Sequence, residues 1–150
     1  MRRSFLGKFF VAVIATQALV TLVHAQGTSV ATGAALPRHK VVFQVSDNDP
    51  KKWELAMSNI RNIQTDLGTD NVAVELVAYG PGLAMLKLES PAANRIADAR
   101  RAGVKIVACE NTMHAQKLTK EDMLTGISYV PAGVSEIILL QEAGYTYVRP

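Results

Sequence analysis

The sequence has 150 residues, which is enough for one domain of ordinary size. It holds 16 basic and 13 acidic residues, but three of the basic ones (Arg2, Arg3 and Lys8) lie at the very start, so the rest of the chain is close to neutral. A nearly neutral chain gives no indication of the basic surface that binds nucleic acid, so we expect no nucleic-acid partner. The single cysteine excludes an intramolecular disulfide.

Residues 1–25 have the pattern of a secretory signal peptide. The basic start is followed by a mostly apolar run over 9–23, and Val23-His24-Ala25 offers small residues at the two positions that determine cleavage. We expect cleavage after Ala25; the alternative is a retained anchor, although the run is shorter than the roughly 20 residues of a membrane span. The mature protein is then periplasmic or secreted, without membrane contact, and residues 26–38 form a flexible start.

The first half of the chain predicts two strands and one long helix. Residues 40–46 are a β-branched apolar run typical of a buried strand. Asp49 can cap a helix that has Pro50 in its first turn, and Gly68 suits the helix end. One apolar face repeats at spacings of three and four: Trp53, Ala56, Ile60, Ile63 and Leu67. Residues 71–79 predict the second strand.

The second half continues the alternation. After Gly80-Pro81-Gly82 we expect a short helical piece at 83–89, a helix from Pro91 to Gly103, and a third strand at 104–109. Residues 110–116 favour a helix, and Thr119 with Asp122 favours a second helix start. A fourth strand, a helix ended by Gly144 and a fifth strand are predicted at 127–130, 131–144 and 145–149.

Strands that alternate with helices predict an α/β fold with a mostly parallel sheet covered on both faces. The helix at 131–144 has little polar face, because Val134 and the run 137–140 are all apolar. Such a helix is either a central core helix or one that another subunit covers.

Ligands of parallel α/β sheets gather beyond the carboxyl ends of the strands. Three loops follow strands in this way: 46–49, 79–82 and 109–112. Cys109 lies between a strand end and a helix start, where free N–H groups favour the thiolate. The neighbouring Glu110 has the opposite effect on the thiol pKa. The alternative for Cys109 is a buried, structural thiol.

Other candidates are weaker. His114 lies a little over one helical turn after Cys109 and is a possible general base. Gly80-Pro81-Gly82 permits close backbone approach, or is only a connection. Asp47 could act in acid–base chemistry, whereas Asp49 suits a helix cap. Too few ligands are present for zinc, so we expect no metal and no cofactor.

Four segments in order resemble the DsrE/DsrF-like family over residues 39–150: "KVVFQVSDNDPKKWELAMSNIRNI", "VELVAYGPGLAML", "GVKIVACENTMHAQKLTKEDML" and "VPAGVSEIILLQEAGYTYVRP". The resemblance implies a three-layer α/β/α domain with a five-stranded parallel sheet, assembled into homo-oligomers. Sulfur-relay members carry a persulfide on a cysteine near the third strand, and Cys109 matches that position. Relatives often have histidine or asparagine where this chain has Tyr79.

Two functions follow. In the first, the protein is a sulfur carrier that uses an accessible Cys109 between a sulfur donor and an acceptor, with Asn111, Thr112, Gly80 and Gly82 binding the charged intermediate. In the second, it is a non-enzymatic, homo-oligomeric module that binds a small ligand at the same strand ends. The candidate ligand-binding residues are Tyr79, Gly80, Gly82, Asn111, Thr112, His114 and Asp47. A redox or metal-stress role is disfavoured, because no resolving cysteine or ligand cluster is present.

Overall fold

The computed structural model describes residues 37–150; the expected signal peptide and most of the expected N-terminal segment lie outside these residues. The strands are β1 (His39–Val45), β2 (Val72–Ala78), β3 (Lys105–Cys109), β4 (Ser128–Val130) and β5 (Thr146–Val148). The α-helices are α1 (Pro50–Leu67), α2 (Ala93–Arg101), α3 (Glu110–Ala115) and α4 (Gly133–Glu142). Three 3-10 helices are η1 (Thr69–Asn71), η2 (Gly80–Leu86) and η3 (Lys120–Asp122).

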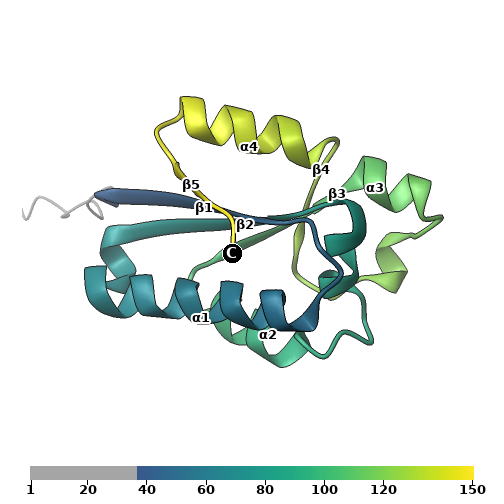
Figure 1. The fold of residues 1–150 in the computed structure, drawn as a ribbon, viewed down its shortest axis with the longest axis horizontal. Helices are drawn as coiled ribbons and strands as arrows, with labels where there is room; N and C mark the ends of the chain where they lie inside the picture. Colours follow the sequence, from purple (N-terminus) through teal and green to yellow (C-terminus); the bar gives the residue numbers. More distant parts are fainter. Residues whose placement is uncertain (1–36) are drawn as a thin grey trace, which may run out of the picture. The chain divides into compact units, whose positions relative to one another are not determined.

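The five strands form one parallel sheet in the order β4-β3-β2-β1-β5. Helices α1 and α2 cover one face of the sheet and α4 covers the other, while α3 lies near the end of β3 (Figure 1). The predicted three-layer α/β/α fold is therefore confirmed. No helix within the described part of the chain is both long and apolar enough to cross a membrane.

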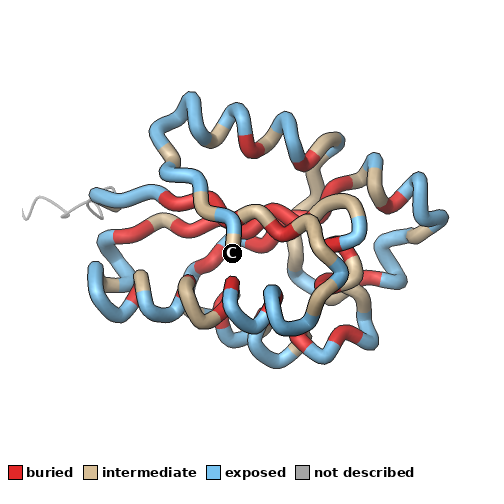
Figure 2. The backbone as a smooth tube through the Cα atoms, viewed as in Figure 1, coloured by how far each residue is buried: buried red, intermediate tan, exposed pale blue. Residues whose placement is uncertain are grey.

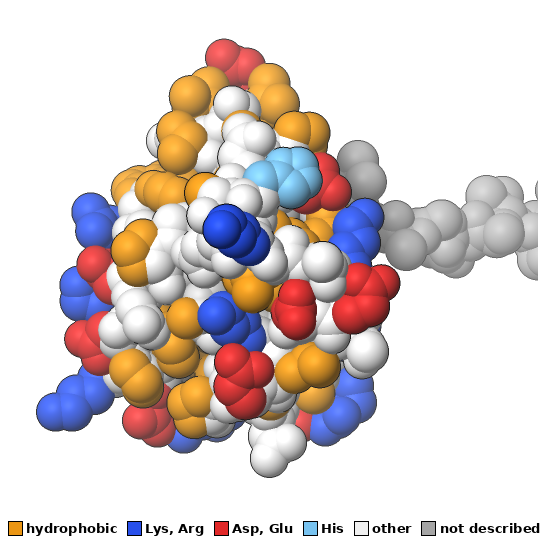
Figure 3. Space-filling model, turned by 90° about the vertical axis from the view of Figure 1, so that its right-hand side faces the viewer, with side chains coloured by type: hydrophobic (Ala, Val, Ile, Leu, Met, Phe, Trp, Pro, Cys, Tyr) orange, Lys and Arg blue, Asp and Glu red, His pale blue; other side chains and the backbone are white. Residues whose placement is uncertain are grey.

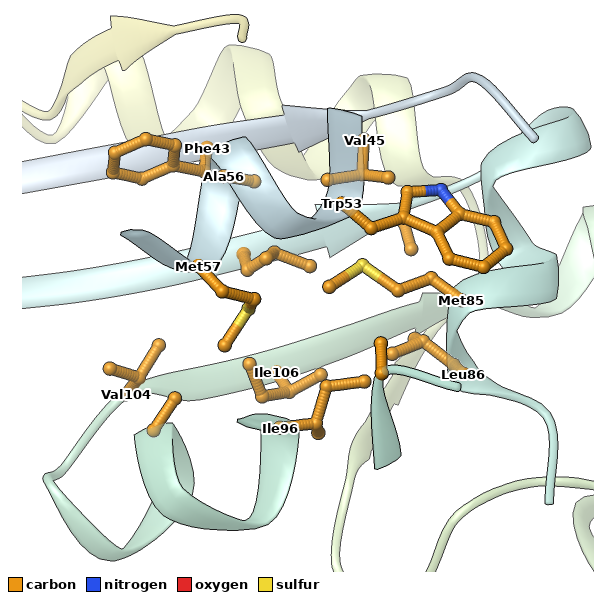
Figure 4. Close-up of a cluster of buried hydrophobic side chains, with 14 of the residues drawn as sticks. Phe43, Val45, Trp53, Ala56, Met57, Met85, Leu86, Ile96, Val104 and Ile106 are labelled. Atoms are coloured by element: carbon orange, nitrogen blue, oxygen red, sulfur yellow. The ribbon is translucent and has the colours of Figure 1, made fainter. Parts of the chain in front are cut away.

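The two faces of the sheet are buried very unequally. The face under α1 and α2 carries the main core, where Phe43, Trp53 and Ile106 are among the side chains that pack together (Figure 4). The other face holds a small cluster that consists of Val42, Val77, Val107 and Ile137, with partly buried neighbours around it. Buried residues are accordingly dense in the three central strands, β1, β2 and β3, and sparse in α4 (Figure 2). Helix α4 thus rests on the sheet through few buried side chains.

The residues predicted to start and stop helices lie at helix ends in the structure. The Asp49 side chain accepts a hydrogen bond from the Lys51 N–H at 2.9 Å and caps α1. Gly68 follows α1 with φ of +88°, a conformation that favours glycine. Thr119 and Asp122 form a reciprocal capping box, as predicted, but it starts only the single turn of η3 rather than a longer helix.

Two other expectations need correction. The helical piece expected at 83–89 is the 3-10 helix η2, which begins earlier, directly at Gly80. Helix α4 is not a central core helix: Val134, Ile138 and Leu139 are 52%, 52% and 58% exposed in the single chain. Its outer face is apolar and uncovered, because the sheet lies on one side of it only.

Candidate functional site

The loops after β1, β2 and β3 lie at one edge of the sheet, as predicted, because all the strands are parallel. The Tyr79 N–H donates to the Val45 carbonyl at 3.1 Å and ties the end of β2 to the end of β1. The Asn111 N–H donates to the Pro131 carbonyl at 3.1 Å and ties the start of α3 to the segment that enters α4. Cys109 is the last residue of β3 and lies between these two hydrogen bonds.

The Cys109 sulfur has several hydrogen-bond donors around it. Burial raises the pKa of the Cys109 thiol. Hydrogen bonding from the Thr112 hydroxyl and from the backbone N–H groups of Gly133, Thr112 and Asn111 lowers it. The net result is a pKa below the usual value. These donors favour the thiolate because they stabilise negative charge on sulfur. In the protonated form, the thiol faces the Pro131 carbonyl at 3.9 Å.

A second set of hydrogen bonds fixes the orientation of Thr112. Its hydroxyl oxygen accepts a hydrogen bond from the Gly80 N–H at 2.9 Å, so the hydroxyl proton is free to point to the sulfur of Cys109. The Gly80 carbonyl in turn accepts from the Gln116 side chain at 3.1 Å. The loop after β2 therefore supports Cys109 through α3, and Gly80 contributes by its backbone.

Gly133 is a further residue of the candidate site, and the sequence pattern did not reveal it. A Cβ atom at this position would lie 3.3 Å from the Cβ of Cys109 and 3.1 Å from that of Tyr79, so glycine allows α4 to begin directly beside the thiol. The sequence signal that could have indicated it is a glycine that follows Pro131-Ala132 and directly precedes an apolar helical run. The close approach leaves Cys109 only 5% exposed. The accessible thiol expected for a sulfur carrier is not found in the single chain.

Other predicted site residues lie apart from the sulfur. Asp47 pairs with Lys52 at 3.1 Å and with Arg149 at 3.5 Å, and the hydrogen bond from Lys52 is the main cause that holds the pKa of Asp47 below its usual value. Gly82 packs against β1, since a Cβ there would lie 2.4 Å from the Val45 carbonyl oxygen. Glycine at position 82 therefore allows the loop after β2 to pack closely on the end of β1.

The His114 side chain is exposed on α3, and no hydrogen bond joins it to Cys109 within the described residues. The geometry therefore does not support it as the general base. In residues 37–150, no group of three or more histidine, cysteine, aspartate or glutamate side chains is arranged to hold a metal ion.

A charged cluster lies on the same face of the sheet as Cys109. The Lys105 ammonium contacts both carboxylate oxygens of Glu75 at 3.1 Å and a carboxylate oxygen of Glu136 at 3.6 Å. Glu75 is 3% exposed, and burial is the main cause that raises its pKa. Burial lowers the pKa of Lys105, but the two glutamates outweigh this effect and the net change is upward.

A model of the DsrE/DsrF-like family matches residues 39–150 of this sequence. The chain belongs to the DsrE/DsrF-like family. This family is related to sulfur-relay proteins. A search of curated proteins gave no match.

Two solved structures are similar to this member of the family. The protein of unknown function MTH1491 from Methanobacterium thermoautotrophicum is 34% identical, with a TM-score of 0.72 over 75% of this chain and 99% of that one. The ychN protein from E. coli has a TM-score of 0.61 over 76% of this chain and 99% of that one. It is only 8% identical, so this second likeness concerns the fold alone.

Proposed function

We propose that this protein carries sulfane sulfur as a persulfide on Cys109, between a sulfur donor and a sulfur acceptor. The observation that supports the proposal best is the position of Cys109 at the end of β3, beside Gly133 at the start of α4 and three residues before Thr112, whose hydroxyl the Gly80 N–H orients. Hydrogen bonding from these segments lowers the pKa of the thiol. A thiolate is the form of cysteine that attacks sulfur. The relation of the family to sulfur-relay proteins agrees with this chemistry.

The transfer step is a thiolate attack on a sulfur–sulfur bond. With inorganic polysulfide as donor, the Cys109 thiolate forms a new S–S bond with a terminal sulfur, and the S–S bond behind that sulfur breaks. The leaving group is a polysulfide dianion that is one sulfur shorter, so no external oxidant or reductant is needed. Handing the outer sulfur to an acceptor thiolate repeats the step and restores the Cys109 thiolate.

Access to Cys109 sets a condition for this function. A thiol that is 5% exposed reacts only when its cover moves or when the donor is small. Tyr79 lies beside Cys109 and is partly exposed, so the movement of its side chain is the simplest opening. In this proposal Tyr79 acts as the cover of the thiol.

Export and self-association belong to the same proposal. Residues 1–25 support a periplasmic or secreted location by their signal-peptide pattern. The exposed Val134, Ile138 and Leu139 support a homo-oligomer, because a contiguous apolar patch marks an interaction surface. Hydrophobic side chains gather on the upper part of the face in Figure 3, the part of the molecule that carries α4.

The intact mass of the purified protein tests the proposal. After incubation with inorganic polysulfide and removal of the excess, the wild type should gain the mass of one or more sulfur atoms, and a reductant should reverse the gain. Cys109→Ser should gain nothing. A wild type that stays at its original mass, although its thiol is alkylated at a normal rate, would rule out the carrier function.

The burial of Cys109 favours a second candidate, a non-enzymatic binding module in which the thiol is structural. This module predicts slow alkylation of the native protein, no sulfur gain in the mass experiment, and unchanged ligand binding in Cys109→Ser. The rate of alkylation in the native and urea-unfolded states separates the two candidates.

A further inference from the structure

Helix α4 contacts β3 at two separate points. Lys105, Val107 and Cys109 lie at alternate positions of β3, so their side chains point to the same face of the sheet. Gly133 lies beside Cys109 at the carboxyl end of β3. Glu136 contacts Lys105, which is the first residue of β3. The helix therefore runs back along the strand that ends in the thiol.

Apart from these two contacts, few side chains of α4 are buried. Ile137 and Gly133 are its buried residues, and Ile137 packs on the small valine cluster. At the far end of the helix, the Lys40 ammonium donates to the Ala143 carbonyl at 3.2 Å. The first turns of α4 have little buried apolar contact, so the Glu136 ion pair and the hydrogen bond from the Asn111 N–H to the Pro131 carbonyl connect them to the rest of the domain.

We propose that the cluster of Glu75, Lys105 and Glu136 is a positioning device that holds the first turn of α4, and with it the Gly133 N–H, against the Cys109 sulfur. This inference rests on the proposed function for its biological meaning, since it describes how the reactivity of the carrier thiol is set. Lys105 is a positioning residue here, because it acts on Cys109 only through α4.

The charges explain why Lys105 is needed. Glu75 is almost fully buried in β2, and the Glu136 side chain, which is 19% exposed, faces it from α4. Without the ammonium between them, the two glutamates lose their shared partner, and where both are ionised they repel each other across the gap between sheet and helix. The helix start would then move away from the sheet, and the sulfur would lose one of its N–H donors.

Two substitutions separate positioning from a direct effect of charge. Lys105→Met removes a positive charge, which by itself raises the thiol pKa, as loss of positioning also does. Glu136→Ala removes a negative charge, which by itself lowers the thiol pKa, whereas loss of the tether to α4 raises it. The opposite signs expected for Glu136→Ala make this variant decisive.

The experiment measures the pH dependence of Cys109 alkylation, together with the NMR shift of the Gly133 amide proton over the same pH range. We expect both variants to move the alkylation midpoint upward by about one pH unit, which means about a tenfold slower reaction below the midpoint. In the wild type, the NMR shift of the Gly133 amide proton should change with pH as Cys109 ionises. In both variants this pH-dependent change should be lost. Lys105→Arg keeps the positive charge, so it should retain the wild-type alkylation midpoint and the wild-type response of the Gly133 amide.

Lys40→Met is the matched control, because it removes the same charge from the same face of the sheet but at the far end of α4. It should leave the midpoint and the Gly133 response unchanged. A downward shift in Glu136→Ala, or an equal upward shift in Lys40→Met, would overturn the proposal. If Lys105→Met does not fold, Glu136→Ala alone decides. None of these readouts needs persulfide, so a failed sulfur-loading experiment would overturn the proposed function and leave this inference intact.

Discussion

Gly133, the first residue of α4, lies directly against Cys109, the last residue of β3: a Cβ atom on the glycine would stand 3.3 Å from the Cβ of the cysteine. The same contact brings the Gly133 N–H to the sulfur. Two helix starts, those of α3 and α4, thus supply N–H donors to one thiol. Substitutions around this contact therefore have definite consequences for the pKa and the reactivity of Cys109.

Gly133→Ala should weaken both packing and the activation of the thiol. The added methyl group would lie 3.1 Å from the Tyr79 Cβ and 3.3 Å from the Cys109 Cβ, closer than ordinary contact, so the start of α4 must shift. We expect a loss of about 1 kcal/mol in the free energy of unfolding and a higher alkylation midpoint, measured by urea unfolding and by the pH dependence of alkylation. Ser135→Ala, on the exposed side of α4, should change neither quantity.

Thr112→Val should raise the pKa of the Cys109 thiol. Valine has the same shape but lacks the hydroxyl that donates to the sulfur and accepts from the Gly80 N–H. Because that N–H loses its partner, the free energy of unfolding should also fall by about 1 kcal/mol. Thr112→Ser keeps the hydroxyl and should behave like the wild type. An unchanged thiolate absorbance titration in Thr112→Val would show that this hydroxyl does not act on the sulfur.

Tyr79→Ala should open the path to Cys109. Removal of a ring that lies beside the thiol exposes the sulfur, so alkylation at a pH above the midpoint should become several-fold faster than in the wild type. Tyr129→Ala, which removes a partly buried tyrosine of β4, is the control and should leave the rate unchanged. Equal rates in Tyr79→Ala and the wild type would mean that Tyr79 is not the cover.

Leu139→Glu should break the proposed homo-oligomer. Leu139 is 58% exposed on the uncovered face of α4, and a carboxylate there cannot be buried without a partner. The molar mass measured by light scattering should drop to that of one chain. Leu88→Glu is the matched control, since Leu88 is 55% exposed outside α4. If both variants keep the mass of the wild type, α4 is not the interface.

The order and type of the elements could be predicted because each left a local signal. The β-branched run of β1, the Asp49-Pro50 start of α1 and the Gly68 stop are decided by neighbours in sequence. Their parallel arrangement then brought the three predicted loops to one edge. Strand order could not be predicted in this way, since it depends on contacts between distant segments.

The candidate site was predictable only in part, for the same reason. Cys109 and Thr112 share one strand–helix junction, so their contact follows from spacing. Gly133 joins them from a later helix, and Glu136 of that helix contacts Lys105 on the face of the sheet that the helix covers. Neither pairing leaves a local sequence pattern. His114 was a candidate by sequence distance alone, and the direction of its side chain on α3 leaves it exposed.

The lowered pKa of Cys109 also fixes how ionisation affects stability. Its native pKa lies below the value of the unfolded chain, so the thiolate favours the folded state. This contribution is complete above the unfolded pKa of about 8.5 and is lost as the pH falls through the native pKa. Urea unfolding should therefore show that the wild type gains stability relative to Cys109→Ser over this interval, and a constant difference would argue against it.

The most direct test is the titration of the ultraviolet absorbance of the thiolate in the native wild type, with Cys109→Ser subtracted. The chain has a single cysteine, so the signal is unambiguous. We expect a native midpoint below the midpoint that the same cysteine shows in the urea-unfolded protein. A native midpoint at or above it would mean that burial outweighs the donors, and that Cys109 is a structural thiol rather than a sulfur carrier.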